Sequence, residues 1–86
     1  MSAQDNLNET QFRVTRASRG DRHAYSVNGD EQQTSKRQYA YATVGEHEGR
    51  PNIYSLHGTR DAAVKKADWF AGGGVRTQPV EISEDR

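Results

Sequence analysis

The chain has no cysteine, and it contains only two prolines, two phenylalanines and one tryptophan among its 86 residues. Without cysteine there can be no disulfide, no thiol nucleophile and no cysteine-ligated metal. No apolar run approaches the length of a membrane span. The first ten residues, MSAQDNLNET, also lack the basic and then apolar pattern of a signal peptide. These absences predict a cytoplasmic protein that does not bind a membrane.

Hydrophobic residues make up only 31% of the chain, and the mean hydropathy is −1.10. A chain of 86 residues predicts a single domain, and so few apolar residues allow only a thin core. Twelve basic residues balance twelve acidic ones. The net charge therefore favours no class of partner, and it argues against a strongly basic nucleic-acid binder.

The stretch Thr59–Gly74, TRDAAVKKADWFAGGG, carries the clearest helix signal. Thr59 is a suitable N-cap, and Asp61 places a negative charge near the positive end of the helix dipole. Asp61 also stands four residues before Lys65, the favourable order for an exposed ion pair. Glycines 72–74 end the helix. At helical spacing, one apolar stripe contains Ala63, Val64, Ala67, Phe70 and Ala71.

Trp69 falls on the opposite, polar side of this helix, with Asp61, Lys65 and Asp68. Two interpretations are open for a tryptophan in this position. Either the C-terminal segment folds over the ring or the last turn is distorted, or Trp69 is an exposed anchor for a partner. Tryptophan is enriched among the residues that carry binding energy at protein interfaces.

Alternation of apolar and polar residues predicts two hairpins before the helix and a short strand after it. Residues 28–37, NGDEQQTSKR, are predicted to form a polar loop that opens with an Asn-Gly turn. The predicted strands cover residues 11–17, 23–27, 38–44, 53–57 and 79–83. This order predicts an α+β fold with two layers, an antiparallel sheet of four to five strands with one helix on one face. Residues 1–10 are expected to be a flexible arm, 11–83 a single domain, and 84–86 a charged tail.

The third predicted strand suggests which face of the sheet meets the helix. An alanine-rich helix suits small residues beneath it, so Ala40 and Ala42 are expected to face the helix. Tyr39 and Tyr41 would then lie on the open face, together with Arg13. Such a face could stack nucleic-acid bases, bind a protein or a second copy of the chain, or simply pair tyrosines across strands.

Basic residues are concentrated in the first hairpin and just before the third strand, where they could form an edge that meets phosphates. At zero net charge, the simpler interpretation is a solvated surface. The residues of this alternative nucleic-acid-binding set are Arg13, Arg16, Arg19, Arg22, Lys36 and Arg37.

No pattern in the chain indicates catalysis, a metal or a cofactor. Glu46, His47 and Glu48 are adjacent at a predicted turn, where neighbouring side chains seldom converge on one ion. His23 and His57 lie on predicted strands, where packing is the commoner role. No serine occupies a nucleophile elbow, and the glycines at 72–74 follow a helix, whereas a phosphate-binding loop precedes one. We expect no enzyme.

The run SLHGTRDAAVKKADWFA, residues 55–71, resembles the passage from strand to helix in phage integrase arm-binding domains and in the plant ethylene-response DNA-binding domain. In those families a three-stranded sheet reads DNA and the helix braces it. Thr59, Ala63 and Ala67 also match small bacterial proteins of unknown function that end in a helix with spaced alanines. The overall make-up is similar to that of small phage-encoded anti-CRISPR proteins, which implies an inhibitor acting in a host cytoplasm.

We therefore expect a non-enzymatic binding protein that blocks a surface of a host defence protein or nucleoprotein complex. A small nucleic-acid-binding module is the alternative, and a homodimer joined through the open sheet face is a third. The predicted partner-binding residues are Trp69, Tyr39, Tyr41, Arg13, Lys65, Glu81, Glu84 and Asp85. The three acidic residues would oppose a basic nucleic-acid channel in the target.

Overall fold

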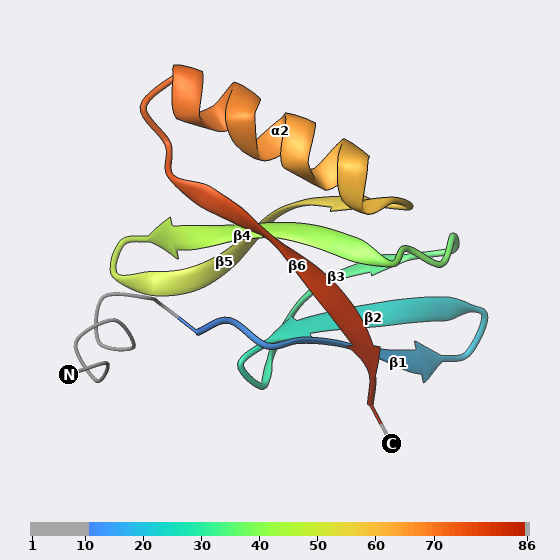
Figure 1. Ribbon diagram of the computed structural model, residues 1–86. Helices are drawn as coiled ribbons and strands as arrows, with labels where there is room; N and C mark the ends of the chain where they lie inside the picture. The colour runs from blue at the N-terminus through green and yellow to red at the C-terminus, as the bar shows by residue number, and fades with distance from the viewer. Residues whose placement is uncertain (1–10, 86) are drawn as a thin grey trace, which may run out of the picture.

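The computed structural model describes residues 11–85, so the predicted N-terminal arm and Arg86 lie outside the described residues. This part of the chain contains six strands and one helix (Figure 1). In chain order they are β1 (Val14–Arg19), β2 (Arg22–Val27), β3 (Asp30–Ser35), β4 (Tyr41–His47), β5 (Arg50–His57), α2 (Arg60–Gly72) and β6 (Thr77–Glu84). No helix within residues 11–85 is long and apolar enough to cross a membrane.

The six strands form one sheet in the order β3-β2-β1-β6-β4-β5. Strands β1 to β3 are a meander, β4 and β5 are a hairpin, and β6 lies between the two units (Figure 1). Neighbouring strands are antiparallel except β1 and β6, which run parallel with Val14 opposite Ile82. The α+β class is confirmed, but the predicted two-layer antiparallel sheet is not: the sheet is mixed and curls until its edge strands, β3 and β5, meet.

The prediction of a polar loop over residues 28–37 is wrong, because β3 occupies most of it. Asn28 and Gly29 have φ angles of 50° and 88°. Two consecutive positive φ angles are typical of the tight two-residue turn that joins hairpin strands. A search for alternation misses β3 because its sequence, DEQQTS, has no apolar residue on either face.

Side chains, rather than backbone ladders, join the edge strands β3 and β5. The pairing registers skip Gln32 on β3 and Tyr54 on β5, so each strand has a β-bulge at this seam. Gln32 accepts a hydrogen bond from the Ile53 N–H at 2.7 Å and donates one to the Pro51 carbonyl at 3.0 Å. Gln33 donates to the Ile53 carbonyl at 3.1 Å. The side-chain amide of Gln32 thus takes the place of a backbone amide in closing the barrel.

The main core lies inside the curled sheet. Its buried members are Val14, Tyr25, Val27, Ala42, Val44, Ile53 and Ile82. The hydroxyl of Tyr25 donates to the Arg37 carbonyl at 3.1 Å and accepts from the Tyr39 N–H at 3.0 Å. A fully buried hydroxyl needs such partners. These bonds tie the connection between β3 and β4 to the core.

Helix α2 lies across β4, β5 and β6, on the side away from the meander (Figure 1). The predicted cap is confirmed, since the Thr59 hydroxyl accepts from the Ala62 N–H at 3.2 Å. The helix ends at Gly72, as the glycines predict. Of the predicted apolar stripe, Ala63 and Ala67 are buried, whereas Ala71 is exposed.

The predicted assignment of sheet faces is wrong. Ala42 belongs to the core inside the barrel, and the buried helix alanines Ala63 and Ala67 do not belong to that cluster. Tyr39 also packs against this core rather than lying on an open face. The reason is the curl of the sheet, because the face of β4 that carries Ala42 and Val44 encloses the interior of the barrel instead of meeting the helix.

Candidate functional site

Trp69 is the one large hydrophobic side chain that stands exposed among residues 11–85, with 67% of its surface accessible. It lies three residues before the end of α2. Asp61, Lys65 and Asp68 are also exposed, as the helical period predicts. The ring is therefore not covered by the C-terminal segment, and its use as an anchor for a partner stays a prediction.

One aromatic ring and one lysine contact the indole of Trp69. The ring of Phe70 contacts those of both Trp69 and Tyr54 edge to face, with centroid separations of 5.3 Å in each case. The Lys66 ammonium lies 4.2 Å from the centroid of the Trp69 ring and 5.5 Å from that of Phe70. Edge-to-face and cation–π contacts favour this position of the indole.

A shallow, mostly apolar concavity lies beside Trp69, and we call it the helix-end surface. It is lined by Asp68, Trp69, Phe70, Gly72, Gly73 and Val75. A second depression, lined by Tyr54, Gly74, Arg76 and neighbouring residues, adjoins it through Val75. The sequence analysis identified Trp69 but missed this surface, because Val75 follows the helix in a segment without alternation. Glycines 72 and 73 were a usable signal, since they line the concavity beside the ring.

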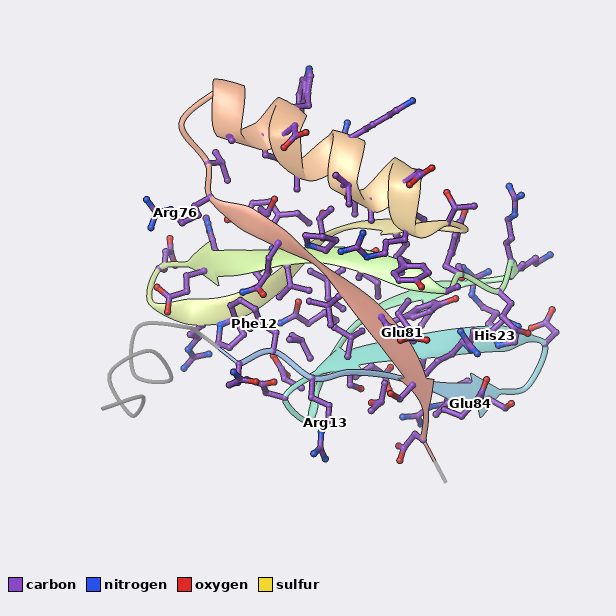
Figure 2. All side chains as sticks on the ribbon, in the orientation of Figure 1. Phe12, Arg13, His23, Arg76, Glu81 and Glu84 are labelled. Atoms are coloured by element: carbon purple, nitrogen blue, oxygen red, sulfur yellow. The ribbon has the colours of Figure 1, made fainter. Side chains whose placement is uncertain are left out.

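The predicted partner-binding residues do not form one surface. Lys65 accompanies Trp69 on the helix, whereas Glu84 lies at the far end of β6 from Arg76 (Figure 2). Glu84 is ion-paired with Arg16, and the Asp85 N–H donates to the Arg16 carbonyl at 2.8 Å.

The remaining members of that set lie elsewhere on the sheet. Tyr41 is half-buried and lies opposite Glu81 in the pairing of β4 with β6. Arg13 points away from the body of the sheet (Figure 2), and it lines a small depression with Glu81. Of the eight predicted residues, only Trp69 and Lys65 therefore lie on the exposed side of α2.

The basic set proposed for nucleic-acid binding is also divided. Arg16 is 7% exposed and donates to both Glu84 and the Tyr39 carbonyl. Arg19 pairs with Glu31. Arg22, Lys36 and Arg37 remain exposed near one end of the meander. Neutralised or buried arginines are poor phosphate ligands. Arg13 is exposed but lies at the opposite end of β1 from Arg22, so three neighbouring cations are left for that role.

A chain of polar side chains between β4 and β5 was not foreseen. Thr43 is fully buried, and its hydroxyl contacts that of Ser55, which in turn shares a hydrogen bond of 2.8 Å with His57 Nε2. Burial first and the Lys66 charge second hold the pKa of His57 below its ordinary value of 6.5. These bonds join β4 to β5. Within residues 11–85, no group of three metal-ligating side chains is placed to hold an ion.

Comparisons with protein-family models, with curated proteins and with solved structures found no match for this chain.

Proposed function

We propose that this chain is a non-enzymatic protein-binding domain that holds its partner through the helix-end surface. One observation carries the proposal: Trp69 is 67% exposed although it lies on a regular helix and is braced by Phe70 and Lys66. Trp69 also borders the mostly apolar concavity of the helix-end surface, and contiguous apolar patches on a surface are typical of binding sites. Tryptophan is a residue type enriched at interface hot spots.

The size of the exposed ring sets the energy that binding could release. A tryptophan buries up to about 250 Å², so two-thirds of it corresponds to roughly 170 Å². At about 25 cal/mol per Å², covering that area gives at most ~4 kcal/mol. This lies in the range of a hot spot, for which truncation costs about 2 kcal/mol or more.

The most specific form of the proposal is the one that the resemblance to anti-CRISPR proteins implies. In that form the partner is a host defence protein or nucleoprotein complex, and this chain is a phage or mobile-element inhibitor that occupies a surface on it. Trp69 and Lys65 would make the contact from α2, because they lie together on its exposed side.

Capture from a bacterial lysate tests the proposal with three forms of the immobilised protein. Wild type and Arg60→Ala should retain the same stoichiometric partner, since Arg60 lies at the opposite end of the helix. Trp69→Ala should weaken binding by about 30-fold, the equivalent of ~2 kcal/mol. If Trp69→Ala retains the partner as well as wild type does, the binding site is elsewhere and the proposal fails.

Nucleic acid is the second candidate, and the exposed cations Arg22, Lys36 and Arg37 favour it. They lie close together because Arg22 bonds Thr34 at 3.2 Å and the other two follow β3 directly. Titration with single- and double-stranded DNA and RNA at two salt concentrations tests this candidate. Binding that weakens steeply with salt and is lost in Arg22→Glu would support it, and no binding at low salt would exclude it.

A further inference from the structure

We infer that the helix-end surface binds an arginine side chain of the partner protein, with the guanidinium against the indole of Trp69. The inference rests on the proposed function and adds the chemistry of the partner. Three properties of the surface point to a cation with an apolar stem: an aromatic platform, a carboxylate in the lining and a glycine floor.

The aromatic platform already accommodates a cation. The chain's own Lys66 ammonium lies over Trp69 and Phe70, at 4.2 Å and 5.5 Å from their centroids. Lys66 does not line the concavity. The indole therefore meets the concavity away from its lysine contact, and a second cation placed there would gain the same attraction to the ring.

The lining of the concavity carries one negative charge. Asp68 is the one charged residue among those that line the concavity. The last turn of α2 contains no basic residue, so no side chain of that turn offsets the negative end of the helix dipole. An exposed carboxylate and a helix C-terminus both favour a cation.

The floor of the concavity is made of backbone. A Cβ added at Gly72 would contact no atom within 4 Å, so the space above this residue is open. A side chain can lie flat on Gly72 and Gly73, with Phe70 and Val75 beside its methylene groups. Such a floor suits a long stem that ends in a charge.

Arginine fits these three properties better than lysine does. Its guanidinium is planar, weakly hydrated and able to stack on an aromatic face while donating hydrogen bonds in its own plane. It could therefore stack on Trp69 and donate to the Asp68 carboxylate at once. The compact, strongly hydrated ammonium of lysine would lose more hydration for a single contact.

Three blocked tripeptides test the inference directly: acetyl-Leu-Arg-Leu-amide and its citrulline and lysine analogues. Trp69 is the only tryptophan, so its fluorescence reports on this site alone. The arginine peptide should give a saturable change with a Kd of about 1–10 mM, which is typical of a single-residue contact. The citrulline peptide should bind at least about 10-fold more weakly because it has the same shape without the charge.

Matched variants identify the carboxylate. Asp68→Asn should weaken the arginine peptide by about 3- to 10-fold, within the range of a charge-assisted hydrogen bond on a partly exposed surface. Asp61→Asn, in the first turn of the same helix, should leave the affinity unchanged. Equal responses to arginine and citrulline, or an unchanged affinity in Asp68→Asn with native circular dichroism, would overturn the inference.

The outcomes separate this inference from the proposed function. If capture of a protein depends on Trp69 but the arginine peptide binds no better than its citrulline analogue, the partner uses other chemistry and only the inference fails. If the arginine peptide binds as described but no captured protein depends on Trp69, the arginine site stands and the proposed function fails.

Discussion

Replacing Gln32 by alanine tests the view that side chains close the barrel. The substitution removes both hydrogen bonds that Gln32 makes across the seam, to the Ile53 N–H and to the Pro51 carbonyl. The backbone of β3 stays in place because its pairing with β2 does not involve this side chain. Gln33→Ala removes a single bond, to the Ile53 carbonyl.

The expected cost follows from the burial of Ile53, which is 3% exposed. A buried N–H left without an acceptor costs about 1–3 kcal/mol, and a lost hydrogen bond to a carbonyl about 1 kcal/mol. Gln32→Ala should therefore lower the free energy of unfolding by about 2–4 kcal/mol, and Gln33→Ala by about 1 kcal/mol. Gln32→Glu, which keeps the acceptor for Ile53 but cannot donate to Pro51 when ionised, should fall between them. Gln38→Ala, at an exposed position, is the control and should change stability by less than ~0.5 kcal/mol.

Urea unfolding followed by far-UV circular dichroism measures these differences, and hydrogen exchange locates them. The Ile53 amide should lose protection in Gln32→Ala and keep much of it in Gln32→Glu. If Gln32→Ala is no less stable than Gln38→Ala, or if the Ile53 amide stays equally protected, then water or the backbone satisfies this group and the glutamine seam does not stabilise the barrel.

Three further substitutions test other features of the fold. A Cβ at Gly45 would lie 2.5 Å from the Arg76 carbonyl oxygen, so Gly45→Ala should lower the free energy of unfolding by about 1–3 kcal/mol in thermal or urea unfolding. A Cβ at Gly58 meets no atom within 4 Å, so Gly58→Ala is the control and should not destabilise the protein. Arg16→Met removes charge-assisted hydrogen bonds from a buried guanidinium and should lower the free energy of unfolding by about 2 kcal/mol. Arg19→Met, at an exposed ion pair, should lower it by less than ~1 kcal/mol, and equal losses would contradict the buried role of Arg16. Because the pKa of His57 is lower in the folded protein than its ordinary 6.5, the unfolded chain takes up this proton first as the pH falls, and the free energy of unfolding should decrease below pH 6.5. That part of the decrease should vanish in His57→Gln, and an NMR titration placing the pKa of His57 at or above 6.5 would refute it.

Local signals predicted the parts of this structure that depend on neighbouring residues. Thr59, the alanines at 63 and 67 and the terminal glycines define α2 through capping and period alone. The exposure of Trp69 follows from the same period. In these cases each residue's role is decided within a few positions of the chain.

The remaining features depend on distant segments, which explains why sequence patterns missed them. β3 has no apolar face because its glutamines bind the backbone of β5 instead of packing into the core. Ala42 and Tyr39 were placed on the wrong faces because the curl of the sheet depends on two bulges that no local pattern marks. The helix-end surface likewise needs Val75 to return beside Phe70, where its N–H donates to the Phe70 carbonyl at 2.9 Å.

The strand order also determines how the protein can fold. Tight turns connect the strands within the meander and within the β4–β5 hairpin. Each of these two units can therefore pair early and independently. The strand that joins them, β6, comes last in the described chain, and its contact between Val14 and Ile82 spans 68 residues. Closing so long a loop is slow, and until β6 arrives, β1 and β4 each present an unpaired edge. Newly made chains are therefore most prone to associate edge to edge before residues 77–84 are in place, and assembly of the sheet ends with its central strand.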